Sequence, residues 1–134
     1  MDFVAELGTP VYATGNGVVS SAGLEAGGYG NCVRIRHGFG YETVYAHLMS
    51  VSVRSGMRVS RGQKIGLLGS TGKSTGPHLH YELRIDGVQR DPTKVILPTA
   101  PPIAKKDLNN FQKETQTLVA RLNFMRSIHL AALE

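Results

Sequence analysis

Cysteine is almost absent from this chain, because Cys32 is the single one among 134 residues. One cysteine cannot form a disulfide within the chain, and it cannot supply a Cys-rich zinc cage. The simplest interpretation of Cys32 is a small buried hydrophobic side chain. The composition therefore excludes a disulfide scaffold and a structural zinc site built from thiolates.

Long apolar runs are missing as well. No run reaches the roughly 18 apolar residues that indicate a membrane span. The first residues also lack the charged-then-apolar pattern of a secretory signal peptide. We therefore expect nothing in this chain itself to export or anchor it.

Aromatic residues are sparse at 7%, and acidic residues are outnumbered, with 10 Asp and Glu against 15 Lys and Arg. The net charge of +5 favours attraction to anionic polymers. However, the basic residues are scattered and few aromatic rings accompany them, which does not support a nucleic-acid surface. We expect no nucleic-acid partner.

What the chain does contain over residues 1–98 is Val, Ile, Tyr and Thr, interrupted by glycine at short intervals. This pattern predicts one all-β antiparallel domain. Tight turns are expected at Asn16-Gly17 and Asp86-Gly87. The expected strands are 10–13, 17–22, 31–37, 41–48, 57–59, 64–68 and 78–85.

Residues 76–85 contain the clearest chemical signal. Alternation along a strand places His78, His80 and Glu82 on one face and the apolar residues between them on the other. Same-face neighbours stand about 6–7 Å apart, so one imidazole can bind a metal while the next reaches a metal-bound water. The alternative is a chance pair of histidines on a solvated face. Glu82 either orients one of these histidines or is a solvent-facing ion-pair partner.

A further histidine occurs in the strand 41–48. There alternation predicts Thr43, Tyr45 and His47 on one face, opposite Val44, Ala46 and Leu48. If this strand shares a sheet with 78–85, His47 can converge with the two other histidines. His37 and His129 are interpreted as non-catalytic.

Two glycine-rich loops accompany these strands. Residues 69–76 resemble a phosphate-binding loop but lack its spacing and its helix, so they are better interpreted as a groove wall. Residues 23–30 either border a cleft or form a mobile connection.

After Pro98 the composition changes. Residues 99–106 are a proline-rich linker, and 107–134 are predicted to form a helical tail that is separable from the β domain. A heptad-like stripe along this helix is interpreted as docking on the β domain or as part of a weakly ordered tail, and self-association through it is the alternative. The stripe comprises Leu108, Phe111, Thr115, Leu118, Leu122, Met125, His129 and Ala132.

Several motifs together resemble the lysostaphin/LytM-type zinc endopeptidases. They are Met1-Asp2-Phe3-Val4-Ala5, Gly8-Thr9-Pro10-Val11-Tyr12-Ala13, Tyr45-Ala46-His47-Leu48, Gly62-Gln63-Lys64-Ile65-Gly66 and Ser70-Thr71-Gly72-Lys73-Ser74-Thr75-Gly76-Pro77-His78-Leu79-His80-Tyr81-Glu82.

This resemblance implies a barrel-sandwich-like β fold and hydrolysis of peptide bonds in bacterial peptidoglycan within the cell envelope, in the periplasm or outside the cell. It implies zinc as cofactor, Asp2 and His80 as metal ligands, and His47 and His78 as catalytic residues.

One feature departs from the family pattern. The family's H-x-x-x-D element has a histidine four residues before the aspartate, a position that would precede Met1. We therefore expect the chain to be truncated at its N-terminus, with Asp2 fraying at the terminus and zinc bound weakly.

Two other functional classes stay open. The first is a non-catalytic LytM-type domain that binds the cell wall or regulates another hydrolase. The second is a carrier domain, since 53–69 also resembles biotinyl and lipoyl domains, although the lysine that they modify at a hairpin tip is missing.

Overall fold

The computed structural model describes residues 1–95, 113, 115 and 116. The chain divides into two compact units, Met1–Val95 and Ile96–Glu134. The predicted linker 99–106 lies outside the described residues, and so does the predicted tail 107–134 apart from Lys113, Thr115 and Gln116, which are helical. The predicted domain boundaries and self-association therefore stay predictions. No helix within the described residues is long and apolar enough to cross a membrane.

The first unit is built from antiparallel strands, which confirms the predicted all-β antiparallel class. Two strands, 64–68 and 78–85, have their predicted bounds. The strands found within residues 1–95 are β1 (Asp2–Val4), β2 (Pro10–Tyr12), β3 (Gly17–Glu25), β4 (Gly30–Arg36), β5 (Tyr41–Val51), β6 (Arg58–Val59), β7 (Lys64–Leu68), β8 (His78–Ile85) and β9 (Val88–Arg90).

Two short strands were not predicted from the sequence. β9 follows the turn Asp86-Gly87, where both residues have positive φ (50° and 79°), as a tight two-residue hairpin requires. β1 pairs with β8, and Asp2 stands directly opposite His80. The expectation that Asp2 frays is therefore wrong. Three residues are too few to show a period, and the β1 partner strand lies far along the chain.

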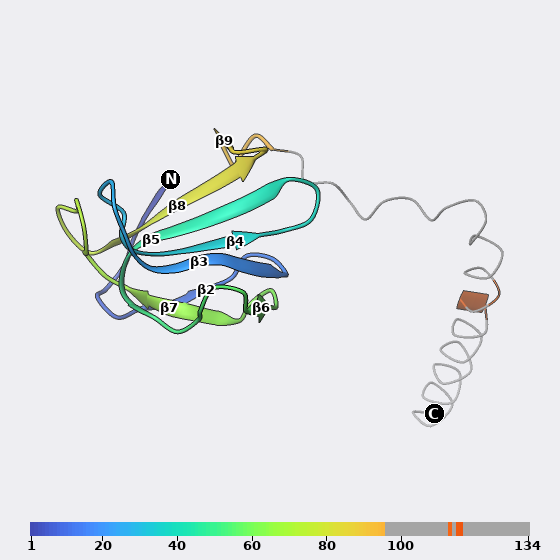
Figure 1. Cartoon of the computed structure of the whole chain (residues 1–134), viewed down its shortest axis with the longest axis horizontal. Coiled ribbons are helices and arrows are strands. Elements are labelled where there is room, and N and C mark those ends of the chain that lie inside the picture. The colour runs from blue at the N-terminus through green and yellow to red at the C-terminus, as the bar shows by residue number, and fades with distance from the viewer. Residues whose placement is uncertain (96–112, 114, 117–134) are drawn as a thin grey trace, which may run out of the picture. The chain divides into compact units, whose positions relative to one another are not determined.

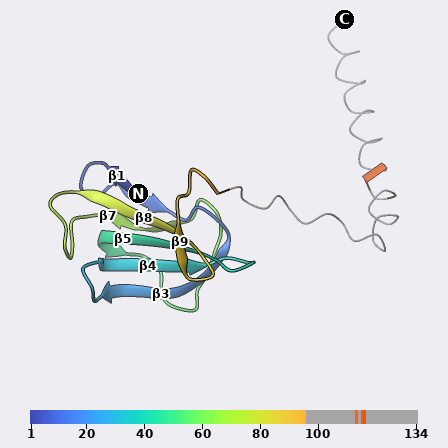
Figure 2. The ribbon, with the colours of Figure 1, turned by 90° about the horizontal axis from the view of Figure 1, so that it is seen from above.

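The strands form two packed layers (Figure 1). In one layer β8, β5, β4 and β3 lie side by side in that order, and Figure 2 shows them in succession with β1 beyond β8. β2 and β7 pair with each other in the second layer, and β6 pairs with β3. The result is sandwich-like, as the sequence resemblance implied.

The core lies between these layers. Its largest fully buried side chains are Tyr45, Ile35, Leu48 and Ile65. A second, smaller cluster of Cys32, Val44 and Ala46 lies on the other face of β4 and β5. Both faces of β5 are therefore covered. The larger cluster comprises Val11, Ala13, Val19, Val33, Ile35, Tyr45, Leu48, Val59, Ile65 and Leu68.

A β-bulge interrupts β5 in its middle. Tyr45 pairs with Val33 and Leu48 pairs with Asn31, so two residues, Ala46 and His47, face the single Cys32. His47 has a φ of 60°. The bulge shifts the alternation, and Leu48 points into the same core cluster as Tyr45. The predicted division, with Leu48 opposite Tyr45, is therefore wrong from His47 onward.

The same bulge marks a fork in the sheet. One edge of β5 pairs with β8 as far as Ala46, and from Leu48 it pairs with β7. The loop between β7 and β8 leaves at this fork, where Gly69 lies against the backbone of β5. A Cβ on Gly69 would stand 2.7 Å from the His47 carbonyl oxygen and would also collide with the Met49 nitrogen.

We expect Gly69→Ala to destabilise the domain by about 1–3 kcal/mol, because the backbone of β5 must move to admit a methyl group. Gly76→Ala is the matched control in the same loop, since no atom lies within 4 Å of its added Cβ. That variant should unfold within about 0.5 kcal/mol of the parent. Urea denaturation measures both, and equal effects of the two changes would contradict the close contact at the fork.

Candidate active site

Asp2 and His80 meet on adjacent strands. Because Asp2 is directly opposite His80 in the β1–β8 pair, their side chains emerge on the same face. The Asp2 Oδ1 atom lies 2.7 Å from His80 Nδ1. This hydrogen bond is the main cause that holds the pKa of Asp2 below its ordinary value. A carboxylate oxygen and a ring nitrogen, both atom types that bind metals, thus point towards the same place.

The other nitrogen of the His80 ring faces a second carboxylate. His80 Nε2 donates a hydrogen bond to Glu82 Oε1 at 2.9 Å. Carboxylates only accept hydrogen bonds, so without metal the ring keeps both contacts only when it carries two protons. A cation bound at Nδ1 would take the place of one of these protons. The ring is therefore held with Nδ1 towards Asp2 and Nε2 anchored.

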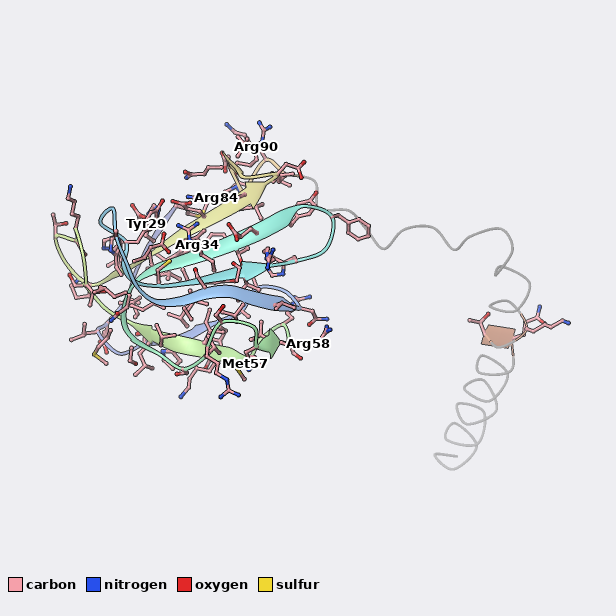
Figure 3. The ribbon with its side chains drawn as sticks, viewed as in Figure 1. Tyr29, Arg34, Met57, Arg58, Arg84 and Arg90 are labelled. Atoms are coloured by element: carbon pink, nitrogen blue, oxygen red, sulfur yellow. The ribbon has the colours of Figure 1, made fainter. Side chains whose placement is uncertain are left out.

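Glu82 is buried, with 3% of its surface exposed, so it is not a solvent-facing partner. Tyr29 donates its hydroxyl to Glu82 Oε1 at 2.9 Å, and the Arg84 guanidinium approaches Glu82 Oε2 to 2.6 Å. Arg84 also donates to the Tyr29 hydroxyl at 3.1 Å, and Figure 3 shows both side chains on the same side of the sheet. Burial works to raise the pKa of Glu82, but the hydrogen bonds from His80, Tyr29 and Arg84 outweigh it and leave the pKa below its ordinary value.

His47 reaches the same face because of the bulge. Plain alternation would point its ring with Tyr45 towards the core, but the ring lies 4.7 Å from the His78 ring and 5.8 Å from the His80 ring, measured between centroids. The three histidines therefore converge as predicted, but the bulge in β5, and not plain alternation, brings His47 to this face. The side chain is almost fully buried, with 7% exposed.

A single loop residue fixes the orientation of His47. Its Nδ1 donates to the Thr71 carbonyl oxygen at 2.8 Å. Thr71 is held in turn, since its hydroxyl donates to the Leu48 carbonyl at 2.8 Å and accepts the Asn31 amide at 2.9 Å. Because the carbonyl only accepts, Nδ1 carries the proton and Nε2 keeps a free lone pair.

His78 is held in the same way. Its Nδ1 lies 2.9 Å from the Gly76 carbonyl oxygen and 3.3 Å from the Ser74 hydroxyl. The carbonyl again requires the proton on Nδ1, which leaves Nε2 as the acceptor. In their neutral forms His47 and His78 therefore present Nε2 as the proton acceptor. In His80, by contrast, Nδ1 is the atom that faces Asp2.

Both glycine-rich loops border the site. Lys73 donates its backbone amide to the Gly28 carbonyl at 2.8 Å, so the two loops are joined. Between them lies a cleft of about 240 Å³. The loop 69–76 is a groove wall as predicted, and for 23–30 the cleft-bordering alternative holds. The cleft is lined by Gly27, Gly28, Tyr29, His47, Lys73 and His80.

The donor atoms of Asp2 and His80 suit zinc, which binds histidine nitrogen and carboxylate oxygen. Catalytic zinc usually has three protein ligands. Among the residues that the structure describes, no group of three or more His, Cys, Asp or Glu side chains is arranged to hold a metal. Asp2 and His80 therefore fit the metal in donor type, and they are two donors where a catalytic zinc usually has three.

The remaining candidates lie elsewhere. His37 has both ring nitrogens engaged, one with the Asn16 carbonyl at 2.7 Å and one with the Thr43 hydroxyl at 2.8 Å. His129 lies outside the described residues. Cys32 is buried, and burial raises the pKa of its thiol to about 12, so it is inert.

Sequence reasoning missed three residues of the site, Tyr29, Thr71 and Arg84. Arg84 could have been predicted from the sequence, because it lies two residues beyond Glu82 on the same strand face. Tyr29 and Thr71 act from loops through contacts with distant strands, and no local pattern marks such contacts.

The sequence and the fold of this chain both match those of known proteins. The profile of peptidase family M23 matches residues 1–92. The chain belongs to this family. Residues 1–92 are called the M23 domain from here on. The resemblance to lysostaphin is also confirmed. The chain is similar to the catalytic domain of the antimicrobial peptidase lysostaphin from Staphylococcus simulans, at 37% identity and a TM-score of 0.66, over 69% of this chain and 73% of that one.

Two further relatives are informative about the M23 domain. The chain is 44% identical to the peptidoglycan DD-endopeptidase ShyA of Vibrio cholerae over 92% of this chain and 29% of ShyA. It resembles the crystal structure of a zinc containing peptidase from Vibrio cholerae at 43% identity and a TM-score of 0.68, over 72% and 30% of the two chains. The chain spans about 29% of the length of the curated relatives it matches first.

We expect Glu82→Gln to destabilise the M23 domain by about 1–3 kcal/mol, because one amide oxygen cannot accept the bonds from His80, Tyr29 and Arg84. The exposed Glu6→Gln is the control and should change the free energy of unfolding by less than about 0.5 kcal/mol. Thermal and urea denaturation measure both. A Glu82→Gln variant as stable as the Glu6→Gln variant would show that the buried carboxylate does not hold this cluster together.

Proposed function

We propose that this M23 domain is the catalytic domain of a zinc-dependent endopeptidase that hydrolyses peptide bonds of bacterial peptidoglycan. The observation that carries the proposal is the convergence of His47, His78 and His80 beside Asp2 on one face of β8. The similarity to ShyA, named a peptidoglycan DD-endopeptidase, supports the substrate, and the similarity to a zinc containing peptidase supports the metal.

In this proposal Asp2 and His80 would hold the zinc, since their Oδ1 and Nδ1 atoms face each other at 2.7 Å. The metal would supply Lewis-acid chemistry, which polarises a carbonyl and activates water at neutral pH. Glu82 keeps His80 in the required orientation by accepting its Nε2–H. A histidine oriented by a carboxylate is also a stronger donor to a metal.

His47 and His78 act as the acid–base pair. Each has Nδ1 bonded to a backbone carbonyl, so each presents Nε2 as a proton acceptor. One ring takes the proton from the attacking water, and a protonated ring then gives a proton to the leaving amine. When protonated, the rings also stabilise negative charge on the carbonyl oxygen. The burial of His47 strengthens these interactions by excluding water.

The substrate determines where the enzyme acts. Peptidoglycan lies in the bacterial cell envelope, so the reaction takes place there, in the periplasm or at the cell exterior. The net charge of +5 favours approach to an anionic wall polymer.

A second candidate function is a non-catalytic domain that binds the wall or regulates another hydrolase. The observation that favours it is the count of two donors, Asp2 and His80, among the described residues. Such a domain needs neither metal nor acid–base histidines. The experiments below separate the two functions.

In a chain lengthened to carry a histidine four residues before Asp2, His80→Ala should abolish zinc retention and activity together, because it removes a metal donor. His78→Ala should keep most of the metal and lower kcat by roughly 100- to 10,000-fold, because it removes one acid–base group. Elemental analysis after dialysis, beside digestion of purified peptidoglycan, measures both quantities. His37→Ala serves as the control histidine. The assignment fails if His78→Ala loses the metal or if His80→Ala keeps it.

A chain that carries a histidine four residues before Asp2 should retain zinc more firmly than the 134-residue chain, because a third ligand completes the usual set. The matched control has alanine at that added position. Chelator competition measures the affinity, and peptidoglycan digestion measures the activity. If the lengthened protein holds one zinc per chain and still leaves peptidoglycan of different cross-link types intact, the regulatory function replaces the enzymatic one.

A further inference from the structure

The cleft beside the histidines is small and open to solvent, so a bound peptide places only part of itself in it. Its volume of about 240 Å³ is below the roughly 300–1,000 Å³ of small-molecule sites. Because His47 and His80 both line it, whatever enters lies next to the scissile bond. The cleft therefore suits one side chain or one terminal group of a longer substrate.

The charge of the cleft comes from one residue. Among its lining residues, Lys73 is the one with a permanent charge. Glu82 is the buried carboxylate closest to Lys73 along the chain. It is hydrogen-bonded to His80, Tyr29 and Arg84, and it does not line the cleft. Asp2 is bonded to His80 and does not line the cleft either, so among the described residues no carboxylate lines the cleft beside Lys73.

Lys73 has no ion pair among residues 1–95, and it is exposed. Acidic partners are nevertheless available to lysines elsewhere, since Lys94 pairs with Asp91 at 3.5 Å. A lysine at the mouth of a cleft, without an acidic partner in the described domain, keeps its charge available for a ligand.

The side chain is also held in position. Its backbone amide is bonded to the Gly28 carbonyl, and its Cβ, Cγ and Cδ atoms cross Gly28 so closely that a Cβ there would stand 3.1–3.3 Å from them. Gly28 has a φ of +103°, which favours glycine. A stem packed on this loop loses less freedom when its ammonium group binds a ligand.

We propose that Lys73 determines substrate specificity by binding a free carboxylate of the peptide next to the cleaved bond. This inference rests on the proposed endopeptidase function, and it adds the chemical class of the group that the cleft accepts. An ammonium group and a carboxylate form a charge-assisted hydrogen bond, which is stronger than one between neutral groups.

The test uses two synthetic stem peptides that differ in one group beside the scissile bond, a free carboxylate or its carboxamide. The parent chain should prefer the carboxylate peptide by roughly 10- to 100-fold in kcat/KM. Lys73→Met should lose this preference, Lys73→Arg should keep most of it, and Lys64→Met, an exposed lysine outside the cleft, should leave it unchanged. Zinc content and melting temperature should be the same in all four proteins.

A binding measurement separates this inference from the proposed function. With a chelator present to prevent hydrolysis, calorimetry should show tighter binding of the carboxylate peptide to the parent and equal binding of the two peptides to Lys73→Met. Loss of activity on both peptides, with this difference in binding intact, would refute the endopeptidase and leave the carboxylate site standing. Equal binding of the two peptides to the parent, or a preference that survives in Lys73→Met, would overturn the role of Lys73.

Discussion

The bulge in the middle of β5 is the constraint on which the fold and the site both depend. Two residues face the single Cys32 there, and His47 takes a left-handed conformation that costs energy for any residue other than glycine. The same interruption lets β5 change its partner from β8 to β7, which produces the second layer of the sandwich. It also turns His47 out of the core and towards His78. One local distortion therefore builds the architecture and assembles the candidate acid–base pair.

The cluster around the buried Glu82 stabilises a charge inside the sheet. A carboxylate with 3% exposure is expensive unless donors surround it, and His80, Tyr29 and Arg84 all bond to it. Because Tyr29 comes from the β3–β4 loop, that loop is tied to the same carboxylate that orients His80. Glu82 therefore connects the loop that forms one wall of the cleft with His80, the candidate metal ligand. Figure 3 shows Tyr29 and Arg84 together with Arg34, whose guanidinium lies 5.2 Å from the centre of the Tyr29 ring.

Alternation along β8 was sufficient to predict that His78, His80 and Glu82 share a face, because the strand is regular and has its predicted bounds. The same rule failed for β5, since a bulge leaves no reliable mark in sequence and shifts every side chain beyond it. The resemblance predicted Asp2 as a ligand, but nothing in the sequence indicated that Asp2 pairs with β8, because that pairing is a long-range contact. Thr71 and Tyr29 escaped prediction for the same reason.

The sequence by itself determined the β class, the strand that carries the H-x-H pair, and the residue types that suit zinc and acid–base chemistry. These properties depend on composition and on a period of two residues, which are local. Tertiary structure alone decided that His47 faces His78, that Glu82 is buried, and that Lys73 lines a cleft together with His47 and His80. Each of these depends on contacts between segments far apart in the chain, and such contacts exist only after the sheet has folded around its core.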